Sequence, residues 1–240
     1  MKNLIKIIFL TIILNTGFSI AQFVENWESE YNGTGNGNDR PSGIAFDDFG
    51  NVYTSGSSKG LNTGNSDIAV VKYNANGVQQ WVARYNGTAN NSDDPYSIFI
   101  INNIIFVSGH TNGSPVLLQY DFDGNLLAEK DLSGYGYINL MLEDKMNNIL
   151  AIGSHLDSVV IFKISSTGEI LWGKNFLHPG TLNTICKSVR LADNGNILLS
   201  GGVNFADAWI AKFDSNGTNI WSKTYNSIFN NLESFDDITI

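Results

Sequence analysis

Short apolar segments alternate with polar turns along almost the whole chain. In the first clear unit the apolar segments are 42–46, 51–56, 67–73 and 78–85. The links between them combine Gly with Asn or Asp, as in 48–51 and 74–77. Gly tolerates positive φ, and Asn and Asp hydrogen-bond their own backbone, so these links predict tight hairpin turns. Because no stretch after residue 21 keeps a helical period, the pattern predicts an all-β protein.

This unit is repeated about every 48 residues, within the range of known repeat proteins. A Trp followed four residues later by an aromatic residue marks 27–31, 81–85, 172–176 and 221–225, with a weaker copy at 128–132. A second landmark is a turn and strand ending at Gly56, Gly109, Gly153 and Gly201. A third is an apolar run ending at Tyr73, Tyr120, Ile164 and Phe213. The three landmarks return in the same order, which indicates four related units of four strands.

The third strand of each unit is apolar on both faces. In the first unit, Ala69, Val71 and Tyr73 share one face, while Ile68 and Val70 lie on the other. A sheet with one wet face would alternate, so these strands are expected to be covered on both sides. Independent β-sandwiches would need about 100 residues each. The sequence therefore predicts a β-propeller of four-stranded antiparallel blades.

The motifs of the unit also resemble those of a known family. Residues 43–56 read G-I-A-F-D-D-F-G-N-V-Y-T-S-G, and K-Y-N at 72–74 and K-F-D at 212–214 precede later turns. Together with the Trp residues, this pattern resembles the bacterial SBBP β-propeller repeat over nearly all of 27–240. The resemblance implies about seven blades and no catalytic residues. The third unit departs most, with Ala128 in place of Trp and Met146 as an apparent insertion.

The strand pattern also predicts an incomplete ring. The propeller domain covers 22–240, and its predicted blades are 42–85, 97–132, 138–176 and 187–225. Trp27 then belongs to a spare outermost strand, and 236–240 begins another innermost strand. The two middle strands of a closing blade are missing, so we expect a chain truncated at its C-terminus, with unpaired edges.

The first 21 residues have the layout of a secretory signal peptide. Lys2 and Lys6 precede an apolar run over 7–14, and small residues precede a break after Ala21. The run is too short for a membrane span, which needs about 20 residues. We therefore expect a secreted or cell-surface bacterial protein that does not remain inserted in the membrane. The Asn- and Ile-rich composition resembles that of exported proteins from Bacteroidota.

Charge and cysteine content narrow the possible partners. The formal net charge of −9 becomes more negative if the leader and its two lysines are removed. An acidic surface repels phosphate backbones and anionic lipids, which argues against nucleic acid as a partner. Cys186 is the single cysteine, so no intrachain disulfide can form. A lone Cys in an apolar strand is predicted to be a small buried side chain.

A calcium site is the one cofactor that the motifs suggest. Its candidate ligands are Asp121, Asp123, Asp214 and Asn216, whose alternating oxygens resemble fragments of a calcium loop. Both segments lack the later Glu of a complete EF-hand loop. Turn formation explains the same residues in every unit, and we expect no other cofactor.

Candidate chemical groups are scattered along the sequence. His110 and His155 both follow a repeated Gly, which suggests a shared site at a blade rim, whereas His178 stands apart. Without a second His or Cys at ligand spacing, loop histidines are the simpler interpretation. A paired-carboxylate site could draw on Glu28, Glu30, Asp93 and Asp94. Glycosylation-type triplets begin at Asn32, Asn86, Asn112 and Asn216, and we interpret them as turns.

Two functions fit this sequence. The first is a non-enzymatic exported scaffold whose loop-lined rim binds an extracellular protein or glycan. The alternative is a hydrolase or lyase acting on extracellular polysaccharide, with its site on the propeller axis. Carboxylates and His gathered at the central mouth would favour the enzyme, and aromatic or amide side chains along a rim would favour binding.

Overall fold

The computed structural model describes residues 27–60, 64–204, 207–226 and 235–238. The predicted signal peptide lies outside this part of the chain. The described residues form sixteen strands and no helix. Within these ranges, therefore, no helix is long and apolar enough to cross a membrane.

The sixteen strands form four blades. The first contains β1 (Arg40–Phe46), β2 (Val52–Lys59), β3 (Ser66–Tyr73) and β4 (Gln79–Tyr85). The second contains β5 (Asp93–Ile101), β6 (Ile104–Thr111), β7 (Ser114–Tyr120) and β8 (Leu126–Asp131). The third contains β9 (Tyr137–Glu143), β10 (Asn148–His155), β11 (Ser158–Ser165) and β12 (Ile170–Phe176). The fourth contains β13 (Thr184–Leu191), β14 (Ile197–Val203), β15 (Asp207–Phe213) and β16 (Asn219–Tyr225).

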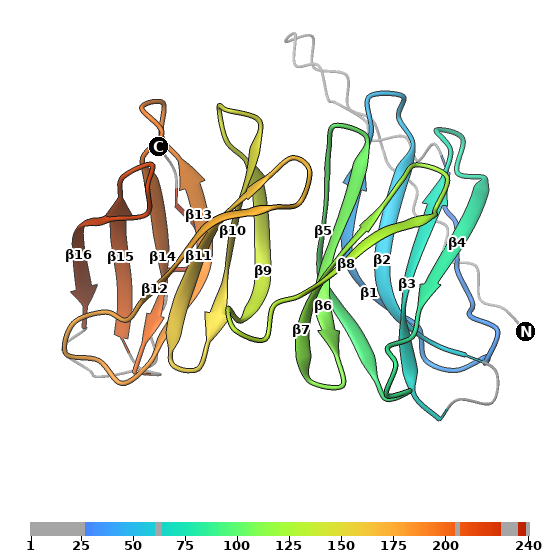
Figure 1. The fold of residues 1–240 in the computed structure, drawn as a ribbon, viewed down its shortest axis with the longest axis horizontal. Helices are drawn as coiled ribbons and strands as arrows, with labels where there is room; N and C mark the ends of the chain where they lie inside the picture. The colour runs from blue at the N-terminus through green and yellow to red at the C-terminus, as the bar shows by residue number, and fades with distance from the viewer. Residues whose placement is uncertain (1–26, 61–63, 205–206, 227–234, 239–240) are drawn as a thin grey trace, which may run out of the picture.

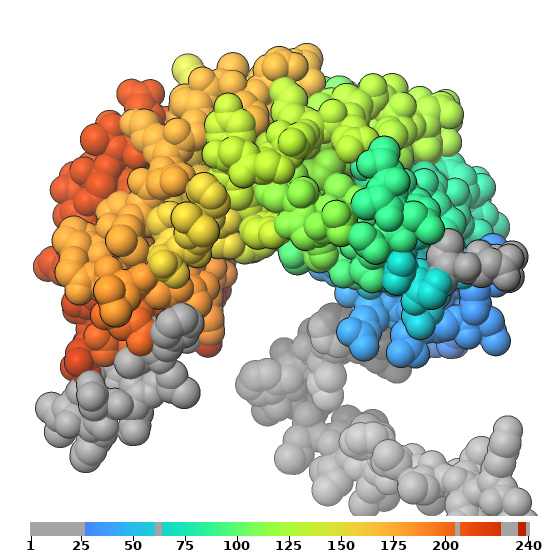
Figure 2. Space-filling view, turned by 60° about the horizontal axis from the view of Figure 1, so that its bottom comes forward, coloured from blue at the N-terminus to red at the C-terminus, as the bar shows by residue number. Residues whose placement is uncertain are grey.

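Each blade is an antiparallel meander in which neighbours in sequence are neighbours in the sheet. The four sheets stand side by side in chain order (Figure 1). Seen after a turn about the horizontal axis, the described residues form an open arc (Figure 2). The predicted fold, an incomplete propeller of four-stranded antiparallel blades, is thus confirmed. β5 and β13 begin at Asp93 and Thr184, before the predicted 97 and 187, because the polar residues there still pair with β6 and β14.

An Asp closes the turn between the first two strands of the first and third blades. Asp47 Oδ1 accepts hydrogen bonds from the backbone N–H groups of Phe49 and Asn51, both at 2.9 Å. Asp144 repeats this pattern, with 2.8 Å to Met146 N and 2.9 Å to Asn148 N. Met146 is therefore not an insertion, as its sequence suggested. The turn keeps its length because Asn147, at φ 60°, stands where the first blade has Gly50.

The core lies between the blades. We call the face of a blade that meets the next blade its forward face, and the opposite face its backward face. Tyr53, Ile68 and Val70 on the forward face of the first blade pack against Ile105 and Leu118 of the second. The later interfaces repeat this arrangement. The middle strands are thus covered on both sides, as their apolar pattern predicts.

The repeated Trp joins the first blade to the second and the third to the fourth, whereas the second blade has Ala128 at this position. The ring of Trp81 lies against Gly124 in the β7–β8 turn, where an added Cβ would be 2.9 Å from the ring. Trp172 covers Gly217 in the same way, and Trp27 covers Gly77. Trp81 Nε1 also donates a hydrogen bond to Phe122 O at 2.9 Å. The segment at 27–31 therefore occupies the position of an outermost strand before the first blade.

Residues 235–238 lie against the fourth blade in the position of an inner strand. Ser200 Oγ donates to Phe235 O at 3.2 Å, as Ser108 Oγ donates to Ile138 O of the following inner strand at 2.8 Å. Ile238 is buried. The segment is not assigned as a strand, but its contacts follow the register predicted for a further innermost strand.

The Asp144 turn leads to a prediction about acid stability. Burial raises the pKa of Asp144, but the ion pair with Lys163 Nζ at 2.7 Å and hydrogen bonds from Asn148 and Met146 outweigh it, so the net pKa is lowered. A carboxyl whose pKa is lower in the folded than in the unfolded state stabilises the fold. The stabilisation is complete above the unfolded-state pKa, about 4, and is lost as pH falls through the folded-state pKa. We expect the urea-derived free energy of unfolding to fall below about pH 4. The decrease should be shallower in Asp144→Asn, and an unchanged slope would contradict this.

Candidate rim site

The inner strand of every blade contains a β-bulge near its start. The residues skipped in the register against the neighbouring strand are Ser42, Tyr96, Asn139 and Lys187. All four are exposed. A bulge redirects a side chain out of the sheet and is common beside functional sites. These four positions vary in chemistry along the chain, and Tyr96 is the one aromatic residue among them.

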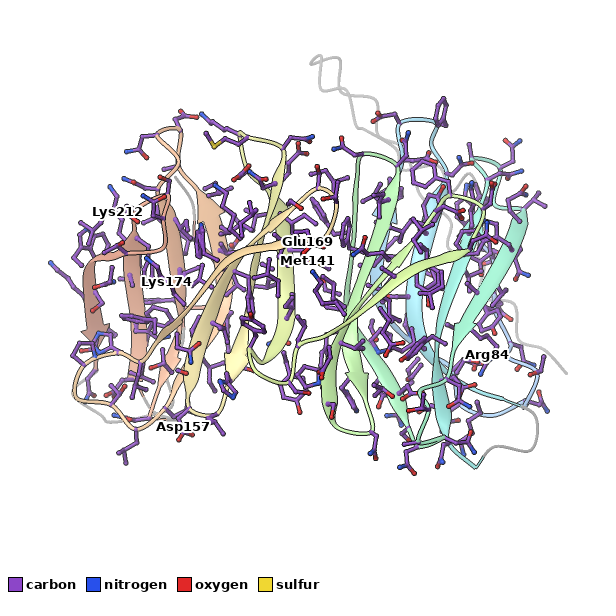
Figure 3. All side chains as sticks on the ribbon, in the orientation of Figure 1. Arg84, Met141, Asp157, Glu169, Lys174 and Lys212 are labelled. Carbon is purple, nitrogen blue, oxygen red and sulfur yellow. The ribbon has the colours of Figure 1, made fainter. Side chains whose placement is uncertain are left out.

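Tyr96 belongs to a compact cluster at the junction of the second and third blades. Its hydroxyl lies 2.8 Å from Nδ1 of His110, on the neighbouring strand β6. Nε2 of His110 lies 3.6 Å from Oδ2 of Asp94. From the third blade, Tyr137 packs edge-on against Tyr96 at 5.8 Å between ring centroids. We call Asp94, Tyr96, His110 and Tyr137 the rim cluster; Figure 3 shows the side chains around this junction, between β5 and β9.

Hydrogen bonds from both neighbouring blades hold the rim cluster in place. The Tyr137 hydroxyl donates to Gly113 O in the β6–β7 turn at 2.5 Å. From the first blade, Ser66 Oγ donates to Asp94 Oδ1 at 3.4 Å. The cluster is therefore held between three blades, and its geometry depends on how those blades pack.

The rim cluster combines aromatic surface with groups that can exchange protons. Burial, with smaller contributions from Tyr137 and Asp94, raises the pKa of Tyr96, so its phenol stays protonated at neutral pH. It can donate to Nδ1 of a neutral His110, whose Nε2–H then faces Asp94. Tyr96 remains partly exposed and can contact a ligand.

Amide side chains extend the polar rim beside the cluster. Asn91 Nδ2 donates to Asn112 Oδ1 at 2.7 Å, and Asn65 Nδ2 donates to Asn90 O at 2.9 Å. Asn86 and Asn90 are joined in the same loop, and Asn32 and Asn36 repeat that bond one unit earlier. The triplets at Asn32, Asn86, Asn112 and Asn216 all lie in turns or connections.

The structure separates the two histidines that the sequence placed together. His110 directly follows Gly109 and lies opposite Asp94 of the inner strand. In the third blade, the residue that directly follows Gly153 is Ser154, which lies opposite Tyr137. His155 comes one residue later, so its side chain lies on the opposite face of the strand. The predicted shared site of His110 and His155 is therefore not formed. His178 is buried elsewhere, with Nδ1 3.1 Å from Pro179 O.

The candidate carboxylates have different surroundings. Asp93 is fully buried, and its Oδ2 accepts a hydrogen bond from Gly87 N at 2.8 Å, closing the loop before β5. Asp39 accepts from Gly33 N in the same way one unit earlier. Glu28 and Glu30 are exposed on the segment before that loop. Of the four predicted carboxylates, the structure brings Asp94 into the cluster with His110.

The calcium candidates are turn residues. Asp121 Oδ1 accepts from Asp123 N and Asn125 N, and Oδ2 accepts from Asn125 Nδ2. Asp214 Oδ1 accepts from Asn216 N at 2.9 Å and Thr218 N at 2.7 Å. Among the described residues, no group of three or more His, Cys, Asp or Glu side chains could hold a metal ion. The carboxylates thus close their hairpins.

Cys186 lies near the start of β13 and is half-buried, less than its sequence context predicts. Burial raises the pKa of its thiol to about 12, opposed by hydrogen bonds with Ser188 and Ser200. Because the thiolate is the reactive form, we expect Cys186 in the folded protein to react with Ellman's reagent at least tenfold more slowly than in urea-unfolded protein. Equal rates in the two states would show that the thiol is accessible.

Comparisons with known proteins bear on the fold. Residues 29–62 match the SBBP model, which describes a β-propeller repeat. This part of the chain is thus an SBBP-type β-propeller repeat. No curated protein matches the sequence. The match begins within the segment at 27–31 and ends just after β2.

Two solved structures share the architecture of this chain, and a third is similar at a lower score. A protein from Lactobacillus plantarum superposes with a TM-score of 0.52 at 16% identity, covering 76% of this chain and 55% of that one. The dihydro-heme d1 dehydrogenase NirN gives 0.50 at 16% identity, covering 76% and 37%. A Bacteroides caccae protein of unknown function gives 0.45 at 12% identity, covering 77% and 81%. The chain thus spans 55% and 37% of the first two proteins, and identities this low show the fold alone.

Proposed function

We propose that the protein is an exported propeller scaffold that binds an extracellular glycan or protein at the rim cluster. The observation that carries this proposal is the exposed Tyr96 ring, held by His110 and Tyr137 and flanked by amide side chains. Aromatic rings stack on the apolar faces of sugars, and amides supply paired donors and acceptors for hydroxyl groups. This combination favours a glycan over a protein as the ligand.

The test is binding to arrayed bacterial and plant polysaccharides. Tyr96→Ala should weaken binding to any polysaccharide that the wild type retains by about tenfold, as expected for one stacking contact of roughly 1–1.5 kcal/mol. Tyr135→Ala is the matched control, because Tyr135 is a similarly exposed tyrosine that packs against Phe162 instead. Equal losses in the two variants, or no retained polysaccharide, would argue against the rim cluster as the binding site.

A second function draws on the same cluster. The Tyr96, His110 and Asp94 side chains form a chain of groups able to pass a proton, as a polysaccharide lyase or hydrolase requires. For this function, incubation with polysaccharides should release new reducing ends or unsaturated products, and His110→Ala should abolish the release. Binding without any product would favour the scaffold.

A further inference from the structure

The backward faces of the later blades show what a covered blade face looks like in this protein. On the third blade, Ile149 and Phe162 are completely buried under Phe106 and Leu117, which come from the two middle strands of the second blade. On the second blade, Ile105 and Leu118 are covered in the same way by side chains from β2 and β3. A hairpin with one apolar face is thus the standard cover.

Within the described ranges, no hairpin covers the first blade in this way. Trp27 and Tyr31 pack against Val52, Val71 and Tyr73, which are buried, and supply a partial cover. The corresponding positions on the backward face of the first blade are Val52, Thr54, Val71 and Tyr73, and they line a cavity of about 300 Å³ whose surface is mainly apolar. Ile44, on the inner strand, is 58% exposed, whereas Ile98 at the same position in the second blade is 6% exposed. The cavity therefore lies where the middle strands of a preceding blade would place their side chains.

The segment at 27–31 forms the outer wall of this cavity. The ring of Trp27 stacks on Tyr73 at 6.1 Å, and Arg84 Nη1 donates to the Tyr31 hydroxyl at 3.1 Å. Within the described ranges, the segment at 27–31 pairs with no strand. It therefore lies beside the apolar cavity in the place of an outermost strand, where an added β-strand could pair with it.

We propose that this cavity binds a β-hairpin of a partner protein, which takes the place of two middle strands between 27–31 and the first blade. The hairpin would carry an aromatic or long aliphatic side chain on one strand and branched aliphatic side chains on the other, directed at Val52 and Val71. A second copy of this chain fits less well. Its forward face on the fourth blade is already partly covered by 235–238.

The β6–β7 hairpin of the protein itself supplies a probe of the required chemistry. A dye-labelled peptide of residues 103–121 contains the tight Asn112-Gly113 turn, with φ values of 49° and 78°, and presents Phe106 and Leu117 on one face. In fluorescence polarisation we expect saturable binding in the micromolar range to the wild-type protein. A peptide carrying Phe106→Ser and Leu117→Ser should bind at least tenfold more weakly.

Two matched protein variants locate the binding. Ile44→Asp places a charge in the cavity and should weaken peptide binding at least tenfold, whereas Ile220→Asp, at a similarly exposed position on β16 outside the cavity, should not. Both side chains are exposed, so both variants should fold. Absence of saturable binding, or equal losses in the two variants, would overturn the proposal. Dimerisation of the protein that Ile44→Asp abolishes would assign the face to a second copy and also overturn it.

Discussion

Replacing Trp209 with alanine is expected to lower the free energy of unfolding by about 3–5 kcal/mol. The indole is completely buried between the third and fourth blades, where it packs against Phe176 at 5.7 Å between ring centroids. Its Nε1 donates to Ile185 O at 2.8 Å. The substitution therefore opens a cavity and also leaves a carbonyl without its partner. Urea unfolding followed by circular dichroism would measure the loss.

Trp221→Ala is the control for this experiment. Trp221 is 38% exposed on β16, so its removal should cost about 1 kcal/mol or less. Trp209→Phe should lie between the two, because it keeps an apolar ring and loses the hydrogen bond. Similar losses for Trp209→Ala and Trp221→Ala would contradict the assignment of Trp209 to the interface core.

Gly153→Ala is expected to destabilise the protein by about 1–3 kcal/mol or more. An added Cβ at Gly153 would lie 1.5 Å from Tyr137 O, a backbone atom of the bulged inner strand. Relief of this clash requires β9 and β10 to separate, because no flexible side chain can move aside. The third blade also holds Tyr137, so the variant should additionally weaken any ligand bound at the rim cluster. A thermal shift assay would report the loss of stability.

Gly134→Ala provides the matched comparison. An added Cβ there would meet nothing within 4 Å, and its neighbours Ser133 and Tyr135 are exposed. The free energy of unfolding of this variant should differ from that of the wild type by a few tenths of a kcal/mol at most. If both alanine variants were equally stable, the contact between the repeated Gly and the inner strand would not be the reason for the Gly.

Much of the fold is readable in the sequence because each unit repeats the same local signals. The turn residues Asp121 and Gly124 and the doubly apolar strand at Ile68 and Val70 predict hairpins covered on both faces, and the structure has them. The sequence could not show why Gly153 recurs, since the reason is a carbonyl on another strand. The predicted insertion at Met146 is wrong because Asn147 adopts the positive φ that Gly adopts in the corresponding turn of the first blade, which the residue types alone do not show.

The rim cluster was predictable only in part. Asp94 and His110 are recognisable in the sequence as titratable groups. Their contact with each other depends on strand pairing, which composition does not reveal. Tyr96 was missed because an aromatic residue in a strand is usually a core residue. Alignment of the inner strands does not reveal it either, because all four units contain a residue at this bulge. His155 was wrongly grouped with His110 because it lies one residue further along its strand, which places its side chain on the opposite face of the sheet.

Three core clusters of the described residues each join two neighbouring blades. The protein should therefore unfold under mechanical force blade by blade and not as a single unit. An end blade has one neighbour to hold it, whereas an inner blade has two. Pulled at its two termini in an optical trap, the protein should extend in discrete steps of roughly one repeat, with the outer blades peeling away before the inner pair.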